Sequence, residues 1–406
     1  MDSKFYVQNM EKITAISSKT YDYIFAFLIL LLPVSKAFPN IVLLVLILNF
    51  FLISKKEDYK NFIKTPFVLI TILVLYLILK SLFLNTLFDE IVFYKKYLYL
   101  FTVPILLMKV NNKQLIKTVS IITINAAIFF SIYKILKFYY YFKYLPFDDG
   151  WATNFVLVFE RPYIGILSVI CILLSIEQIE LKTKGKYFFY ASALISFSFI
   201  FFISIRASIF TLFIIFLLYC GFYLKRGKQK KILLSIVFFS IFSISLLLNN
   251  TIQKRFLIGD TYSQTIKNIQ HFEPRVVIWG CSKEVVNQDY FSKIIGSNSY
   301  TNMESTLKEC YANKVNDFSR KQWFLERGFN THNQFIDFYL IGGTIAIILF
   351  IGFFVVYLIV NHKNYYATAI IIAFLLFLVV ENMFHRQFGC FIFTIFTPLF
   401  LKSNNT

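Results

Sequence analysis

His332 is the residue of this sequence best suited to acid–base chemistry. Histidine is the side chain whose unperturbed pKa lies nearest neutrality, so it can accept or release a proton under ordinary conditions. His332 stands where a long polar stretch, 250–331, meets a new apolar run, so it can face lipid and water together. We predict that it acts as a general base. The alternative is an interfacial polar residue, which is our interpretation of His271 and His362.

Three arginines also stand where polar and apolar stretches meet. Arg206 lies in a short turn between two apolar runs, Arg275 opens a predicted helix after Glu273, and Arg161 opens another apolar run. The planar guanidinium fork matches the oxygens of a phosphate. We therefore predict that Arg206 and Arg275 bind the phosphate of an anionic ligand and that Arg161 belongs to the same basic pocket. The alternatives are snorkelling of Arg206 to the lipid surface and a surface ion pair between Arg275 and Glu273.

The composition predicts that membrane helices position these residues. The 406 residues are 58% hydrophobic and 16% charged, with a mean hydropathy of +0.65. Soluble domains have only about 45–50% apolar residues. The net charge of +19 comes from basic residues that flank apolar runs, which is the topogenic pattern of membrane proteins. We therefore expect a lipid bilayer as a partner and no nucleic acid.

The apolar runs predict an all-α polytopic membrane protein with about 12 transmembrane helices, since a span needs about 20 mainly apolar residues. Spans 1–9 fall within 21–249 and spans 10–12 within 333–402, with a large helical extracytoplasmic loop, 250–332, between spans 9 and 10. Tails at 1–20 and 403–406 complete the chain. The twelve candidates are 22–38, 40–54, 66–84, 91–108, 115–138, 161–178, 187–205, 206–223, 231–249, 333–360, 365–381 and 388–402.

The short loops predict the orientation. Alternate loops are rich in lysine and arginine, and the positive-inside rule places these loops and both tails in the cytoplasm. The loop 250–332 then lies outside, on the same side as His332 and the three arginines. Within it, Pro274 to Asn287 and Met303 to Val315 are predicted helices.

The five cysteines predict no metal site, because no pair has the spacing of metal ligands. Cys171, Cys220 and Cys390 fall in apolar runs and are expected to be small buried residues. Cys281 and Cys310 both fall in the external loop, where a disulfide or two free thiols are equally compatible with the pattern. We expect no metal ion and no other cofactor.

The order of several motifs resembles the O-antigen ligase family of bacterial membrane proteins. His332-Asn333, followed eleven residues after the histidine by Gly343, is similar to its His-Asn…Gly signature. Ile205 separates Ser204 from Arg206, whereas many members have Ser and Arg adjacent, so this match rests on Arg206. Further matches are Arg161-Pro162-Tyr163, Arg275…Trp279…Gly296 and the closing Glu381…Gln387-Phe388-Gly389.

The resemblance implies a twelve-span glycosyltransferase in the bacterial inner membrane, with its active site on the periplasmic side. The donor would be a glycan linked to undecaprenyl diphosphate, and the acceptor a sugar hydroxyl of lipid A-core or of another glycan. The transfer would proceed with inversion and without a metal ion. His332 would be catalytic, Arg206, Arg275 and Arg161 would bind the diphosphate, and Asn333, Gly343, Glu381 and Arg386 would support them.

Three functions remain open from the sequence. An O-antigen ligase and a polymerase that joins lipid-linked repeat units share the donor chemistry and differ only in the acceptor. A transporter of lipid-linked saccharides is the alternative from another class, although it predicts charges near mid-membrane. An ion pair between Glu381 and Arg386 is the structural alternative to a role of either residue in the site.

Overall fold

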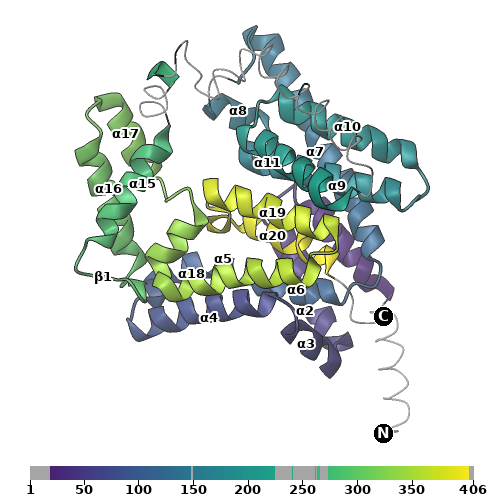
Figure 1. Cartoon of the computed structure of the whole chain (residues 1–406), viewed down its shortest axis with the longest axis horizontal. Coiled ribbons are helices and arrows are strands. Elements are labelled where there is room, and N and C mark those ends of the chain that lie inside the picture. The colour runs from purple at the N-terminus through teal and green to yellow at the C-terminus, as the bar shows by residue number, and fades with distance from the viewer. Residues whose placement is uncertain are drawn as a thin grey trace. The chain divides into compact units, whose positions relative to one another are not determined.

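The computed structural model of the chain describes residues 19–147, 150–224, 240, 261, 263–265 and 273–401. Most of these residues are helical (Figure 1). The predicted ninth span, 231–249, and the loop segment 250–272 lie almost wholly outside the described residues. So do most of the N-terminal tail and the whole of the C-terminal tail.

Several helices have the length and composition of membrane spans. Among the described residues, five helices are long and apolar enough to cross a bilayer: Leu87–Met108, Lys113–Phe142, Arg161–Glu180, Arg206–Tyr223 and Gln334–Asn361. Four shorter apolar helices accompany them: Phe67–Phe83, Lys186–Phe202, Tyr365–Val380 and Gln387–Phe400. Many large apolar side chains on these helices are exposed, as lipid-facing residues are. The chain is therefore a helical membrane protein, and the count of twelve spans stays a prediction.

The chain divides into two compact units, and the first comprises Met1–Val68, Leu100–Ile200 and Phe391–Thr406. Its helices include a first helix at 19–31, α2 (Phe38–Ile53), α3 (Lys56–Ile63), most of α6 (Tyr99–Met108), α7 (Lys113–Phe142), α8 (Gly150–Val156), α9 (Arg161–Glu180), most of α10 (Lys186–Phe202), the end of α20 (Gln387–Phe396) and η3 (Pro398–Phe400). Helices α7 and α9 pack together, and Lys117 of α7 pairs with Glu177 of α9 at 2.7 Å.

The first unit corrects one expectation. The lysine-rich stretch after the second predicted span is not an open loop but the helix α3, and α2 and α3 meet at a bend of 115°. The Asp58 carboxylate accepts a hydrogen bond from the backbone N–H of Lys55 and forms an ion pair with Lys109. These contacts cap the start of α3, which the hydropathy pattern alone does not reveal.

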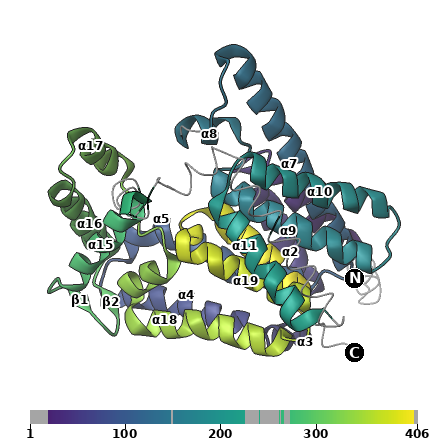
Figure 2. The same cartoon turned by 45° about the horizontal axis from the view of Figure 1, so that its top comes forward.

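The second unit comprises Leu69–Tyr99 and Phe201–Cys390. Its elements are most of α4 (Phe67–Phe83), α5 (Leu87–Tyr97), α11 (Arg206–Leu218) with the π-turn η1 (Tyr219–Tyr223), α15 (Pro274–Val286), β1 (Phe291–Ser292), β2 (Gly296–Ser297), α16 (Tyr300–Lys314), α17 (Phe318–Arg327), α18 (Gln334–Asn361), α19 (Tyr365–Val380), η2 (Met383–His385) and the start of α20. Helix α19 packs against both α18 and α11. The hairpin formed by β1 and β2 lies against α18 (Figure 2).

Helix α18 is not the continuous span that the sequence predicts. It breaks at Gly343, whose φ of 64° and ψ of −158° are non-helical. The tip of the β1–β2 hairpin enters the break, so the backbone N–H groups of Thr344 and Ile345 donate to the carbonyls of Lys293 and Ile294. A backbone break at membrane depth is tolerated only where its polar groups find such partners.

The same break exposes carbonyls, and α4 provides the donors for them. The Tyr76 hydroxyl donates to the Gly342 carbonyl at 2.9 Å, and the Lys80 ammonium donates to the Ile341 carbonyl. The approach is so close that a Cβ on Gly343 would lie 2.3 Å from the Ile294 oxygen. Gly343 therefore admits a hairpin tip rather than only the neighbouring helix expected from the sequence.

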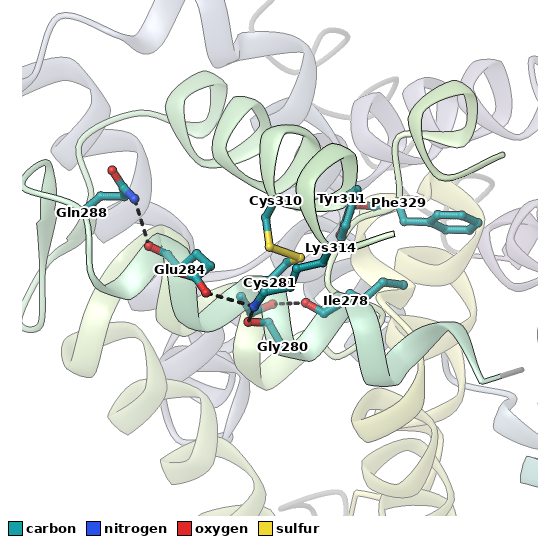
Figure 3. The surroundings of a disulfide bond; sticks show 10 residues. Ile278, Gly280, Cys281, Glu284, Gln288, Cys310, Tyr311, Lys314 and Phe329 are labelled. Carbon is teal, nitrogen blue, oxygen red and sulfur yellow. Dashed lines mark hydrogen bonds and ion pairs between the residues drawn. A yellow bond between two sulfur atoms is a disulfide. The ribbon is translucent and has the colours of Figure 1, made fainter. Parts of the chain in front are cut away.

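Helices α15, α16 and α17 form a small layer at one end of the second unit, which we call the cap. The structure confirms the two predicted helices as α15 and α16, whereas α17 is a further helix that we did not predict. A disulfide between Cys281 and Cys310 joins α15 to α16, with a Cα–Cα distance of 5.6 Å (Figure 3). Beside it, Lys314 of α16 forms an ion pair with Glu284 of α15.

Candidate functional site

His332 lies in the short connection between the cap and α18. Its φ of 44° is left-handed, which is uncommon for a residue with a side chain and is maintained here by its neighbours. The Trp279 indole donates to the carbonyl of Thr331 at 3.0 Å, and the N–H of His332 donates to the side chain of Asn330. These two bonds hold the backbone on the N-terminal side of the imidazole.

Glu381, at the end of α19, faces His332. The Nδ1 atom of His332 lies 3.4 Å from the Glu381 carboxylate, a contact too long to be a good hydrogen bond. Burial alone would raise the pKa of the Glu381 carboxyl, but His332, Arg275 and Arg386 together bring that pKa below its usual value. Glu381 is therefore a carboxylate that can accept from Nδ1–H and leave Nε2 as the basic nitrogen.

Arg275, in the first turn of α15, connects the cap to the end of α19. Its Nε and Nη2 atoms both donate to the carbonyl of Val380, the residue before Glu381, at 3.1 and 2.8 Å. Its Nη1 atom donates to Glu273 at 2.8 Å. The ion pair with Glu273, which we considered as the alternative to phosphate binding, is therefore present, and most of the guanidinium fork is already occupied.

Arg206 is the first residue of α11 and forms an ion pair with the Glu273 carboxylate. Its Nη2 atom lies 3.0 Å from the second oxygen of Glu273. Burial alone would raise the pKa of the Glu273 carboxyl, but Arg275 and Arg206 bring that pKa below its usual value. In the described part of the chain this is the one hydrogen bond that the Arg206 side chain makes, so more of its donors remain for a ligand than those of Arg275.

The predicted catalytic and phosphate-binding residues of the second unit thus form a continuous series of contacts. Glu273 forms ion pairs with both Arg206 and Arg275. Arg275 donates to the backbone carbonyl before Glu381, and Glu381 contacts His332. Four separate segments of the sequence contribute to this series, which we call the Arg–His cluster (Arg206, Glu273, Arg275, Glu381 and His332). The arginines at one end suit a diphosphate, and the histidine at the other end suits a reacting hydroxyl group.

Arg161 belongs to the first unit, whereas the Arg–His cluster belongs to the second. It is the first residue of α9, and its backbone N–H donates to the side chain of Asn154. Its Nη2 atom lies 3.5 Å from the carbonyl of Phe147, at the limit of a hydrogen bond. Its role in diphosphate binding stays a prediction.

The remaining predicted supporting residues have distinct positions. The side chain of Asn333 caps α18 by accepting from the N–H groups of Phe335 and Ile336. Gly343 forms the break in α18 described above. Arg386 is exposed and acts on Glu381 electrostatically, while Glu381 itself contacts His332. Asn333 and Gly343 therefore shape the backbone that carries His332.

Sequence reasoning missed Asp337, which forms a second polar cluster with His385 next to the first. The buried Asp337 carboxylate in the first turn of α18 lies 2.7 Å from Nε2 of His385 and accepts a hydrogen bond from Asn382 at 3.1 Å. Asn382 also donates to Thr331, the neighbour of His332. Asp337 could have been found from the sequence, since it is the single charged residue of α18 and ionisable groups inside apolar helices rarely lack a purpose.

Within the described residues, no three His, Cys, Asp or Glu side chains gather as metal ligands would. The groups that do gather are guanidinium, carboxylate and imidazole, which suit the binding of an anion and the movement of a proton. No known protein-family model matches this chain, and no curated protein matches it either.

Proposed function

We propose that this protein is a membrane glycosyltransferase that moves a glycan from undecaprenyl diphosphate to a hydroxyl group of a sugar acceptor. The observation that carries the proposal is the Arg–His cluster. It combines donors for a diphosphate leaving group with a histidine oriented by a carboxylate, and it lies at the ends of apolar helices. In its specific form, the proposal is an O-antigen ligase with lipid A-core as the acceptor.

The proposed reaction is a single displacement at the anomeric carbon. Nε2 of His332 takes the proton of the acceptor hydroxyl as its oxygen forms the new bond to that carbon. The bond from the anomeric carbon to the phosphate oxygen breaks, and undecaprenyl diphosphate leaves with the electron pair. Arg206 stabilises the charge that develops on the diphosphate, while Arg275 positions Glu381 and contributes its remaining donors.

The proposal places the cap and the Arg–His cluster on the non-cytoplasmic side of a bacterial inner membrane, in a chain of about twelve spans. Two observations support this side. The basic residues of the short loops favour a cytoplasmic location for those loops. The disulfide in the cap is of the kind that persists in oxidising compartments.

A transfer assay tests the proposal. The protein, purified into nanodiscs, would receive a polyprenyl-diphosphate-linked glycan and an acceptor glycolipid, and transfer would be followed by mass spectrometry. We expect His332→Gln to lower the rate by roughly 10²–10⁴-fold, which is the usual contribution of a general base. The control is His362→Gln, since His362 is an exposed histidine at the other end of α18. Full transfer by His332→Gln would exclude the mechanism.

A further inference from the structure

Three aromatic rings lead from the surface of the cap to the candidate base. The Trp323 ring of α17 lies 4.6 Å from the Phe329 ring, which lies 5.5 Å from the His332 ring, centroid to centroid. We call these three residues the aromatic ladder. Its outer end, Trp323, is 38% exposed, and its inner end belongs to the Arg–His cluster.

The cap holds the aromatic ladder firmly. Gly328 ends α17 in the left-handed conformation and turns the chain so that Phe329 lies beside Trp323. The Tyr311 hydroxyl of α16 donates to the Phe329 carbonyl at 3.1 Å, and Tyr311 follows Cys310 of the disulfide (Figure 3). The buried ring of Phe324 packs against both Tyr311 and Phe329. A preorganised ring surface binds a ligand without having to be ordered first.

The two tryptophans of the cap are used differently. Trp279 has its indole N–H bonded to the Thr331 carbonyl, so it serves the backbone beside His332. In the described part of the chain, the indole N–H of Trp323 has no hydrogen-bond partner, although the ring stands at the surface. A buried tryptophan usually bonds through its N–H group, whereas the exposed Trp323 can offer both its apolar face and its N–H group to a ligand.

We infer that Trp323 and Phe329 form a sugar-binding subsite, at which one pyranose ring of the glycan stacks while a neighbouring sugar reacts at His332. A pyranose presents apolar C–H groups on its faces and hydroxyl groups at its rim, which match an aromatic face and a free indole N–H. This inference rests on the proposed function, because it takes His332 as the reacting end. The stacked sugar belongs either to the donor glycan or to the acceptor.

A membrane-facing role of α17 is the competing explanation, since this helix is basic and also carries an exposed Phe318. Phe318 and Trp323 are five residues apart, which places them about 140° apart around the helix. Only Trp323 joins the aromatic ladder, whereas Phe318 is 74% exposed and outside it. Phe318→Ala is therefore a matched control for Trp323→Ala, since both remove an exposed ring from the same helix.

The first experiment measures binding without catalysis. The probe is the free oligosaccharide that mild acid releases from the carrier lipid of the producing cells, titrated calorimetrically into the nanodisc-held protein with His332→Gln in place. We expect Trp323→Ala to weaken binding about tenfold, Trp323→Tyr to restore most of it and Phe318→Ala to leave it unchanged. Equal binding by Trp323→Ala and its parent, or no binding by the parent, would overturn the subsite.

Two further measurements complete the test. In the transfer assay, Trp323→Ala should raise KM about tenfold for the substrate whose sugar it stacks, with kcat little changed, and this identifies the donor or the acceptor. The second measurement is flotation of the detergent-purified protein with vesicles of phosphatidylethanolamine and phosphatidylglycerol, which should be the same for all variants. If Trp323→Ala changes flotation but not glycan binding, α17 faces the membrane and the subsite is rejected. If His332→Gln transfers normally while the tryptophan effect on binding persists, the catalytic proposal fails and the subsite stands.

Discussion

Two histidine–carboxylate pairs occupy neighbouring positions in the second unit, and they are built differently. His332 and Glu381 are separated by 3.4 Å, and 25% and 13% of their side chains are exposed. His385 and Asp337 are separated by 2.7 Å, and 10% and 0% of their side chains are exposed. The first pair is loose and reaches solvent, while the second is short, buried and supported by Asn382.

The differences in distance and exposure indicate different roles for the two histidine–carboxylate pairs. A buried polar pair with its hydrogen bonds satisfied holds helices in place, and removal of one member leaves the other without a partner. A pair with one member open to solvent can exchange protons with a ligand, and loose geometry before the substrate binds is common among catalytic groups. We therefore propose a structural role for Asp337 and His385 and a catalytic role for His332 and Glu381.

The largest expected effect comes from breaking the buried pair. Asp337→Ala leaves His385 and Asn382 without their shared acceptor, so we expect a loss of about 3–5 kcal/mol of stability. The thermal unfolding temperature in detergent, followed by circular dichroism, measures this loss. Asp89→Ala is the control, since Asp89 is an exposed acidic residue of the same unit. An unchanged unfolding temperature for Asp337→Ala would remove the structural assignment.

The next effect concerns the break in α18, which sets the direction of the helical leg that carries Asp337. In Gly343→Ala, the new Cβ meets the Ile294 carbonyl and the residue must keep a positive φ, so we expect a loss of about 2 kcal/mol. The control is Gly352→Ala in the same helix, where a Cβ would make ordinary contact with Leu69 at 3.5 Å. Equal unfolding temperatures for the two variants would show that the hairpin tip does not require a glycine.

The pattern of apolar runs is sufficient to predict a helical membrane protein, and local helix signals within the polar loop predict α15 and α16. It does not predict the break in α18, because Gly342 and Gly343 are also common in continuous packed helices, and only the hairpin tip at Ile294 distinguishes the two cases. The sequence resemblance places Arg206, Arg275 and His332 in one site, and the structure joins these three residues through Glu273 and Glu381. The pairing of Glu273 with Arg275 is local, but the contacts of Glu273 with Arg206 and of Glu381 with His332 join distant segments and depend on tertiary structure.

A smaller effect should distinguish the two pairs, because a change in the His332–Glu381 pair should lower activity rather than stability. Glu381→Gln keeps the shape of the side chain but removes the charge that orients His332. We expect roughly a tenfold lower kcat, as is usual when a residue that orients a catalytic group is lost, with the unfolding temperature nearly unchanged. A fall in unfolding temperature as large as that of Asp337→Ala, with kcat intact, would reverse the two assignments.

The smallest effect is the pH dependence of the exposed pair. Burial would raise the pKa of Glu381, but His332, Arg275 and Arg386 stabilise the carboxylate. The pKa in the folded protein is therefore below the ordinary value of 4.5. The stabilisation is therefore complete above pH 4.5 and is lost as the pH falls through the folded-state pKa. We expect less than about 1 kcal/mol, as for other partly exposed ion pairs. The difference in unfolding temperature between the wild type and Glu381→Gln should shrink as the pH falls from 6 to 3, and a difference that grows instead would show that Glu381 is protonated in the folded protein.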